Sequence, residues 1–370
     1  MAPRRSPGPL LSFTDTELRS AESTIVFNPQ PIETQPFKKP WYYYIPLFGT
    51  IFLILAPHPS LLYVLVTFHL QTLHQPVLFI THLLVTYTLT FLAFSSLIVC
   101  LARDPGPANA PPSRMEGNDR EDGEMDLREA LLSDTDFSSP GRWCRKCWAP
   151  KPERAHHCSI CDRCVLKMDH HCPWIGAKCI GHRTYPAFVH FLCCITLLCV
   201  YVAIVAVNGL LYAFRNPFAV HEFTPVHEIV LAFTGGVFSL IIGSFACYHI
   251  YLIFTNQTTL ENITPFMLLR HLPPLPRSGH SLSDPPLEPE LSQAQRRIVK
   301  DAHGHILIYD LGWRQNFAQV FGWNRKYGWL SRLWCGGASM GDGKTFPRNP
   351  RAEEMLARLA KELVSVDSDR

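Results

Sequence analysis

Four long stretches of this chain are apolar, and polar or charged segments separate them. No Lys, Arg, Asp or Glu occurs in residues 45–70, 77–101, 188–214 or 229–254. A helix needs about 20 apolar residues to cross a bilayer, so each stretch is long enough for one span. Trp41 and the three tyrosines after it resemble an aromatic belt at a membrane boundary. The pattern predicts an α-helical polytopic membrane protein with four transmembrane helices, the first of which Pro57 and Pro59 interrupt.

The distribution of basic residues predicts the orientation. Residues 71–75 form a short polar connection, so the first two spans should make a hairpin. Four spans place both termini on one side, and of the 34 Lys and Arg only Arg215 falls in a loop on the other side. By the positive-inside rule, both termini and the region between spans 2 and 3 should be cytosolic. The membrane would be that of the Golgi, endoplasmic reticulum or vacuole, or the plasma membrane.

The same pattern divides the chain into six parts. We expect a disordered cytosolic N-terminus (1–42), transmembrane helices 1 and 2 (43–101) and an acidic, Pro-rich cytosolic linker (102–142). A small cysteine-rich domain (143–188), transmembrane helices 3 and 4 (187–254) and a cytosolic C-terminal tail (255–370) follow.

Two features stand out in the tail. Aromatic residues are dense from 306 to 334, and we expect this segment to pack back onto the protein or the membrane interface. Apolar side chains recur at helical spacing from Ala352 to Leu363, which predicts a short amphipathic helix. That helix either docks onto its own domain or contacts a partner or the membrane.

Composition adds two limits. The net charge of +3 is too mild to indicate a nucleic-acid-binding protein, so no nucleic-acid partner is expected. The cysteines between 144 and 179 form Cys-x2-Cys pairs with histidines among them. This is the spacing of a metal site and not of a disulfide framework, so the cluster should face a reducing compartment.

The cysteine-rich stretch contains more metal ligands than two zinc sites need. Seven of the 13 cysteines and four histidines lie between residues 144 and 179. Structural zinc takes four such ligands in a tetrahedral array, so two sites would use eight of the eleven. One pair, Cys144 and Cys147, forms a first knuckle, and residues 157–164 supply a second group with one histidine and three cysteines.

The surplus points to chemistry beyond metal binding. In the run from Asp169 to Cys172, adjacent side chains point in different directions, so one zinc cannot easily collect His170, His171 and Cys172 together. A free cysteine beside an imidazole is an activated nucleophile, and a neighbouring carboxylate can orient that imidazole. A thiol near the membrane surface suits a substrate with a polar head and a fatty tail, such as a long-chain acyl-CoA. The alternative is a zinc-only ribbon or RING-like module tethered to the membrane.

Residues 169–174, Asp-His-His-Cys-Pro-Trp, lie within this cysteine-rich frame and resemble the DHHC protein S-acyltransferase (palmitoyltransferase) family. Weaker signatures extend the resemblance. Residues 104–106 are similar to the family's DPG motif, and residues 258–261 are similar to its TTxE motif. Residues 309–322, with Asn316 among aromatics, loosely resemble its C-terminal region.

The resemblance implies a role for each surplus and metal-binding residue. One structural zinc would be held by Cys144, Cys147, His157 and Cys164. The other would be held by Cys158, Cys161, His171 and Cys179. Cys172 would be the acyl-accepting nucleophile, His170 its base and Asp169 the residue that orients His170, with His156 in a supporting position.

The implied function is transfer of a palmitoyl group from acyl-CoA, the co-substrate, to cysteines of cytosolic or membrane-associated proteins through a Cys172 acyl-enzyme. The alternative is a non-enzymatic, membrane-tethered zinc scaffold. The sequence departs from the family pattern at two places. Six residues, not five, separate Cys172 from Cys179, and Thr184 replaces an asparagine.

Overall fold

The structure is a computed structural model that describes residues 40–108, 143–147, 149–275, 282–323 and 328–368. The expectations of disorder for the N-terminus before Pro40 and for the linker from 109 to 142 lie outside the described residues.

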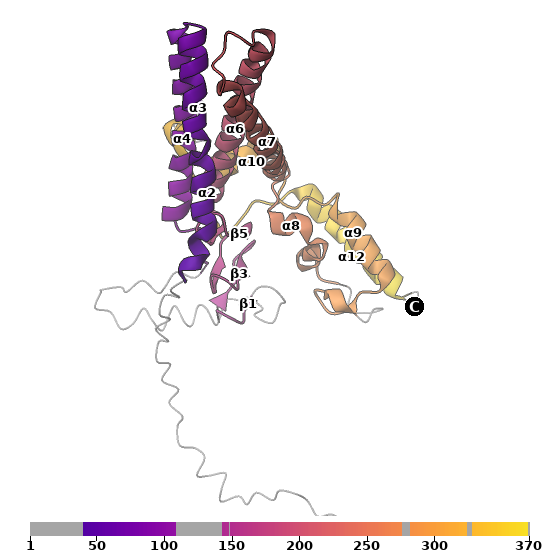
Figure 1. Cartoon of the computed structure of the whole chain (residues 1–370). Coiled ribbons are helices and arrows are strands. Elements are labelled where there is room, and N and C mark those ends of the chain that lie inside the picture. Colours follow the sequence, from indigo (N-terminus) through magenta and orange to yellow (C-terminus); the bar gives the residue numbers. More distant parts are fainter. Residues whose placement is uncertain (1–39, 109–142, 148, 276–281, 324–327, 369–370) are drawn as a thin grey trace, which may run out of the picture. The chain divides into compact units, whose positions relative to one another are not determined.

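Among the described residues, four helices are long and apolar enough to cross a membrane: Trp41–Thr72, Pro76–Ala102, Tyr185–Arg215 and Thr224–Phe254. The predicted four-span architecture is confirmed, and the chain is an integral membrane protein. Figure 1 shows the spans as α2 (Ile45–Leu55) with α3 (Pro57–Val64), then α4 (Pro76–Ala102), α6 (Tyr185–Arg215) and α7 (Thr224–Phe254). A 3-10 turn η1 (Trp41–Tyr44) opens the first span, and the π-helical η2 (Leu65–Thr72) closes it.

The prolines of the first span do not end it. Pro57 occupies the first turn of α3, where a missing N–H breaks no helical hydrogen bond. Ala56 before it keeps helical angles, and its N–H still donates to the carbonyl of Phe52 at 2.8 Å. The chain therefore continues in the same direction to Thr72.

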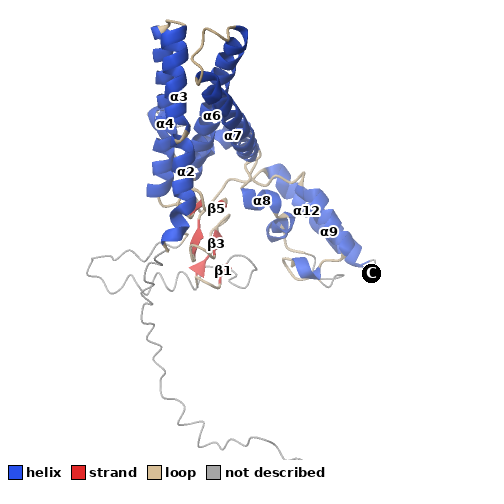
Figure 2. Cartoon of the chain, viewed as in Figure 1, coloured by secondary structure: helices blue, strands red, loops and turns tan. Residues whose placement is uncertain are grey.

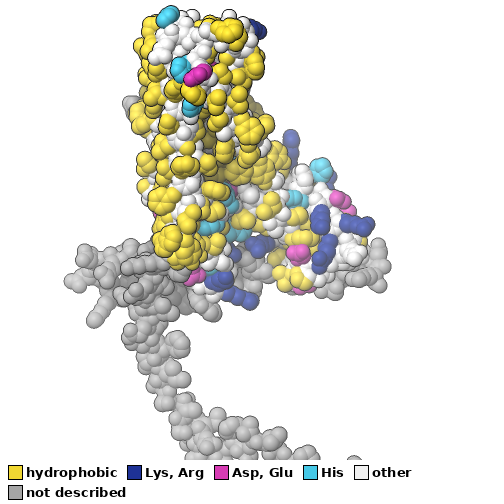
Figure 3. All heavy atoms as spheres, in the orientation of Figure 1, with side chains coloured by type: hydrophobic (Ala, Val, Ile, Leu, Met, Phe, Trp, Pro, Cys, Tyr) yellow, Lys and Arg dark blue, Asp and Glu magenta, His cyan; other side chains and the backbone are white. Residues whose placement is uncertain are grey.

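The spans pack around α6, which contacts both α4 and α7. A Cβ atom on Gly235 of α7 would lie 2.9 Å from the carbonyl oxygen of Cys199, so glycine permits the close approach of α6 and α7. Figure 3 shows hydrophobic side chains covering the visible outer surface of the spans, whereas Lys and Arg gather over the C-terminal elements.

The cysteine-rich region consists of three small antiparallel hairpins between α4 and α6 in the sequence (Figure 2). They pair β1 (Trp143–Cys144) with β2 (Ala149–Pro150), β3 (His156–Cys158) with β4 (Arg163–Val165), and β5 (His170–Cys172) with β6 (Lys178–Ile180). The predicted cysteine-rich module between spans 2 and 3 is confirmed.

The tail is helical. It contains α8 (Thr259–Ile263), η3 (Pro265–His271), η4 (Glu288–Glu290), α9 (Gln293–His303), α10 (Trp313–Phe321), α11 (Gly328–Cys335) and α12 (Pro350–Ser368). The predicted amphipathic helix is α12, and it buries Leu356, Leu359 and Leu363 in one cluster with Leu269 and Val299. Of the two alternatives, docking onto the chain's own domain is the one observed.

The aromatic-rich segment contacts both the protein and the outer surface of a span. Tyr309 is buried, and the Phe317 ring packs on Phe254 at 5.1 Å between centroids. Trp334 of α11 lies edge-on to Phe91 of α4 at 5.5 Å and stays 47% exposed. This segment therefore anchors the tail to the spans and presents aromatic surface beside them.

Replacing Leu363 tests the docking of α12. Leu363 is fully buried, so Leu363→Ala is expected to destabilise the C-terminal cluster by about 2–5 kcal/mol. Limited proteolysis should then cut the tail faster. Lys361→Ala, an exposed position on the same helix, is the matched control. Equal cleavage rates for the two variants would show that α12 is not packed as described.

Candidate functional site

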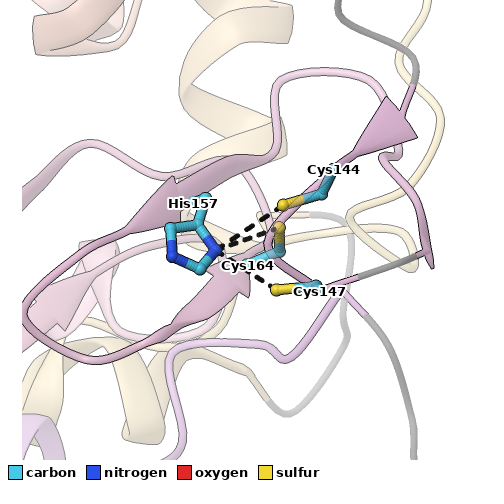
Figure 4. Close-up of side chains that lie close together, drawn as sticks. All are labelled: Cys144, Cys147, His157 and Cys164. Carbon is cyan, nitrogen blue, oxygen red and sulfur yellow. Dashed lines mark hydrogen bonds between the residues drawn. The ribbon is translucent and has the colours of Figure 1, made fainter. Parts of the chain in front are cut away.

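The first group of metal ligands converges on one imidazole nitrogen (Figure 4). Nδ1 of His157 lies 3.6 Å from Sγ of Cys144 and 3.2 Å from Sγ of Cys147. Sγ of Cys164 lies 4.0 Å from the same nitrogen. A tetrahedron with Zn–S of about 2.3 Å and Zn–N of about 2.0 Å has S···N edges of about 3.6 Å. The four side chains therefore fit a tetrahedral zinc ion.

The second group has the same geometry. Nδ1 of His171 lies 3.6 Å from Sγ of Cys158, 3.5 Å from Sγ of Cys161 and 3.7 Å from Sγ of Cys179. The Sγ atoms of Cys161 and Cys179 are 3.6 Å apart. The part of the chain that the structure describes thus has two Cys/His clusters compatible with zinc, and Cys179 takes the fourth position of the second.

Strand register explains why each cluster forms. In the β3–β4 hairpin His157 lies opposite Cys164, and in β5–β6 His171 lies opposite Cys179. Side chains directly opposite each other share a face and have Cβ atoms about 5 Å apart. Each hairpin therefore supplies one histidine and one cysteine, and the Cys-x2-Cys turn before it supplies the other two ligands.

The additional residue before Cys179 is accommodated in the β5–β6 turn. Gly176 and Ala177 both have left-handed backbone angles, with φ of +62° and +47°. A Cβ on Gly176 would lie 2.8 Å from the Leu101 side chain, so the turn lies close against the end of α4. The insertion thus lengthens the turn and leaves the pairing of His171 with Cys179 intact.

Thr184, the second departure, is buried at the start of α6. Its Oγ1 accepts a hydrogen bond from the N–H of Gly181 at 3.1 Å, and its carbonyl accepts from the N–H of Phe188 at 3.0 Å. The threonine hydroxyl therefore closes the loop between β6 and α6 locally.

Alternation along β5 separates the metal ligand from the reactive pair. Successive side chains of a strand point to opposite faces, so His170 and Cys172 share one face and His171 occupies the other. His171 points to the second metal cluster. His156 belongs to neither cluster, and burial lowers the pKa of His156 to about 4, so this imidazole is neutral at physiological pH.

Asp169 holds His170 by a short hydrogen bond. Nδ1 of His170 donates to Oδ2 of Asp169 at 2.7 Å. Burial acts to raise the pKa of Asp169, but the hydrogen bond and charge of His170 outweigh it, so the pKa lies below its ordinary value. Burial likewise disfavours charged His170, yet contacts with Asp169 and Cys172 raise the pKa of His170 to about 9. The pair therefore favours an imidazolium next to the Cys172 sulfur.

The turn after span 4 orients Asp169 from the other side. Thr259 donates its backbone N–H to Oδ1 of Asp169 at 2.9 Å and its hydroxyl to Oδ2 at 2.7 Å. Thr258 caps α8 in a capping box with Glu261. The Glu261 carboxylate in turn accepts from Nε and Nη2 of buried Arg154 at 2.7 and 2.6 Å. The TTxE residues thus connect Asp169 to the cysteine-rich hairpins.

Sequence reasoning missed three contributors to the site. In the sequence, Arg154 carries no pattern that distinguishes it from arginines of the surface, and only the fold buries it against Glu261. Nδ1 of His249, in α7, lies 3.2 Å from Oη of Tyr185, and its ring centroid lies 5.9 Å from that of His170. The sequence does place His249 as a polar side chain inside an apolar span, a position that indicates a functional role. Thr259 belongs to the TTxE motif, but the motif by itself does not indicate its contact with Asp169.

Comparison with known proteins identifies the family. Residues 138–265 match the DHHC palmitoyltransferase family. This segment of the chain belongs to that family. It is 41% identical over 167 residues to palmitoyltransferase PFA3 of Gibberella zeae, which covers 45% of this chain and 29% of that protein. It is 33% identical over 206 residues to human palmitoyltransferase ZDHHC2, covering 56% of this chain and 46% of that protein.

A third relative is similar over a longer segment. Palmitoyltransferase ZDHHC15 of Rattus norvegicus is 34% identical over 223 residues, which is 60% of this chain and 54% of that protein. The chain thus spans about half or less of the length of these curated relatives. Both Cys/His clusters, the Asp169–His170 pair and the TTxE residues lie inside the segment that matches the DHHC family.

Proposed function

We propose that this chain is a protein S-acyltransferase that moves a palmitoyl-type acyl group from acyl-CoA to protein cysteines through an acyl-enzyme on Cys172. The observation that carries the proposal is the 2.7 Å contact between Asp169 and His170, with Cys172 on the same face of β5 as His170. Cys172 is also buried among apolar residues of the spans, including Phe188 and Leu97, which suits a thioester with a fatty tail.

In the first half-reaction, His170 accepts the thiol proton of Cys172. The resulting thiolate attacks the carbonyl carbon of the acyl-CoA thioester, and the bond between that carbon and the CoA sulfur breaks. The CoA thiolate leaves and takes the proton from the His170 imidazolium. Asp169 keeps Nδ1 of His170 protonated and so presents Nε2 to the sulfur.

In the second half-reaction, a substrate cysteine takes the place of CoA. His170 removes the proton of the substrate thiol, and the substrate sulfur attacks the acyl carbon. The bond between that carbon and the Cys172 sulfur then breaks. The Cys172 sulfur recovers the proton, and the acyl group leaves on the substrate protein. The substrates would be cytosolic or membrane-associated proteins with accessible cysteines.

Zinc would be structural in this scheme. The ligands Cys144, Cys147, His157 and Cys164 would hold one ion, and Cys158, Cys161, His171 and Cys179 the other. Four protein ligands leave no open position for a substrate, so the ions supply rigidity to the hairpins and no bond-making step.

The proposal includes an orientation. Both termini and the cysteine-rich region would face the cytosol, as the distribution of Lys and Arg indicates. The membrane would be an endomembrane of the Golgi, endoplasmic reticulum or vacuole, or the plasma membrane.

The test is retention of the acyl group. Purified chain incubated with labelled long-chain acyl-CoA should keep the label through denaturation and release it with neutral hydroxylamine, which cleaves thioesters. Adding a protein with a membrane-proximal cysteine should move the label to that protein. A non-enzymatic zinc scaffold, the alternative, would retain no label while binding zinc.

Thr259→Val tests whether the TTxE hydroxyl positions the reactive pair. The substitution removes the 2.7 Å hydrogen bond to Asp169 and changes the side-chain volume little. A hydrogen bond to a charged group contributes about 1.5–3 kcal/mol, so acyl-enzyme formation should slow by about 10- to 100-fold. Single-turnover labelling measures the rate of acyl-enzyme formation. Thr264→Val, whose hydroxyl makes no cap contact, is the control; equal rates would exclude this role.

A further inference from the structure

A cavity of about 450 Å³ lies where two spans end, and the reaction proposed above does not use it. Its lining includes Arg103, one residue after α4, and Arg183, two residues before α6. Lys344 and Asp342 line it from the segment that connects α11 to α12. Side chains from three parts of the sequence therefore meet at the same end of spans 2 and 3.

The lining has an excess of positive charge. It contains three cationic side chains, Arg103, Arg183 and Lys344, and one carboxylate, Asp342. His182 adds no charge, because burial lowers the pKa of His182 to about 4. The nearby carboxylate of Asp104 is already paired with Arg163 at 2.7 Å.

The three cationic side chains that line the cavity have N–H groups that could bind an anion. Nη1 of Arg103 donates to the carbonyls of Arg183 and Gly337 at 3.1 and 3.3 Å, which fixes the guanidinium. Among the described residues its Nε and Nη2 groups have no hydrogen-bond partner. Within the part of the chain that the structure describes, Arg183 and Lys344 are exposed and their side chains form no salt bridge. An anion in the cavity would meet all three.

The wall of the cavity is held in place by the loop after α11. Ser339 Oγ donates to the carbonyl of His182 at 2.6 Å. Gly343 has φ of +78°, and a Cβ there would lie 2.7 Å from the His182 ring, so glycine lets the loop close over this histidine. The loop is therefore packed against the start of span 3.

An apolar surface adjoins the cavity. The loop follows α11, whose Leu330, Leu333 and Trp334 are about half exposed, and Trp334 packs on the outer face of α4 at Phe91. Basic residues at the end of a span, next to tryptophan, are typical of the headgroup level of a membrane. The cationic cavity lies beside this apolar surface, because Arg103 donates to the carbonyl of Gly337, two residues after α11.

We propose that this cavity binds the phosphate-bearing headgroup of an anionic phospholipid, whose acyl chains lie along α4 and α11. Basic pockets at the ends of spans hold such headgroups by charge, and the adjoining apolar surface distinguishes a lipid from a soluble phosphate. The inference does not rest on the acyl-transfer activity.

The test measures lipid binding to the full chain. The protein is reconstituted in phosphatidylcholine vesicles, and a fluorescent phosphatidylinositol bisphosphate is titrated in. Each basic side chain near an anionic headgroup contributes a factor of about five, so Arg183→Gln with Lys344→Gln should weaken binding about 25-fold. Arg297→Gln with Lys300→Gln, two exposed cations of α9, changes net charge equally and should leave binding unchanged.

Further controls distinguish a membrane lipid from a soluble phosphate compound as the ligand. Arg183→Lys with Lys344→Arg keeps both charges and should keep binding, and zinc content and thermal unfolding verify folding of every variant. Equal binding by the two Gln double variants would overturn the proposal. Displacement of the lipid by CoA, or equally tight binding of soluble inositol phosphate, would also overturn it, because the cavity would then serve a soluble phosphate.

Discussion

Cys172→Ser is expected to abolish acyl-enzyme formation and transfer while the chain keeps two zinc ions. A serine hydroxyl is a far weaker acid than a cysteine thiol and does not supply the sulfur nucleophile that the thioester intermediate needs. The substitution replaces one atom at a buried position, so the hairpin should remain folded. Labelled acyl-CoA and metal analysis on the same sample measure both quantities.

The structure explains why metal should be unaffected. Cys172 lies on the face of β5 opposite to His171 and belongs to neither Cys/His cluster. Cys335→Ser, a change at another cysteine outside the clusters, is the control and should still accept label. Loss of one zinc from Cys172→Ser would make Cys172 a ligand and would end the catalytic proposal.

Cys179→Ala is expected to reduce the zinc content from two ions to one and to abolish acylation as well. Three remaining ligands bind zinc far more weakly than four, and the free energy of metal binding is folding free energy, on the order of 10 kcal/mol for small zinc modules. The β5–β6 hairpin would lose the contact that joins Cys179 to His171 at 3.7 Å. Because β5 also carries His170 and Cys172, the reactive pair would lose its geometry.

Mass spectrometry measures the zinc content of Cys179→Ala, and thermal unfolding measures its stability. Cys193→Ala, in α6 and outside both clusters, should keep two zinc ions. Retention of both ions by Cys179→Ala would mean that the additional residue before it has displaced this cysteine from the metal.

Much of the architecture follows from local sequence. Water is absent from the bilayer core, so a spanning segment must satisfy its backbone hydrogen bonds within a helix, and an uncharged run of sufficient length identifies it. Cys-x2-Cys spacing likewise determines the metal knuckles, since each pair folds around one ion. The run of residues 169–172 added the family resemblance and with it the roles of Asp169, His170 and Cys172.

Contacts between distant segments were beyond local reasoning. The longer β5–β6 turn contains left-handed backbone angles at Gly176 and Ala177, and Gly176 lies against Leu101 of α4, a contact between segments far apart in the sequence. Whether α12 docks onto the chain or onto a partner depends on which apolar surface covers the apolar face of α12. In the structure, residues of η3 and α9 supply that surface.

The sequence by itself thus determined four spans, a zinc-type module between the second and third, and the candidate nucleophile, because each depends on residues close together in the chain. Only the tertiary structure showed that β5 is a paired strand in which His171 lies opposite Cys179, since that requires a defined register. It also decided that Thr259, 90 positions after Asp169 in the chain, donates two hydrogen bonds to its carboxylate. Charge at a buried aspartate is stable only where such donors converge, and that convergence is a property of the fold.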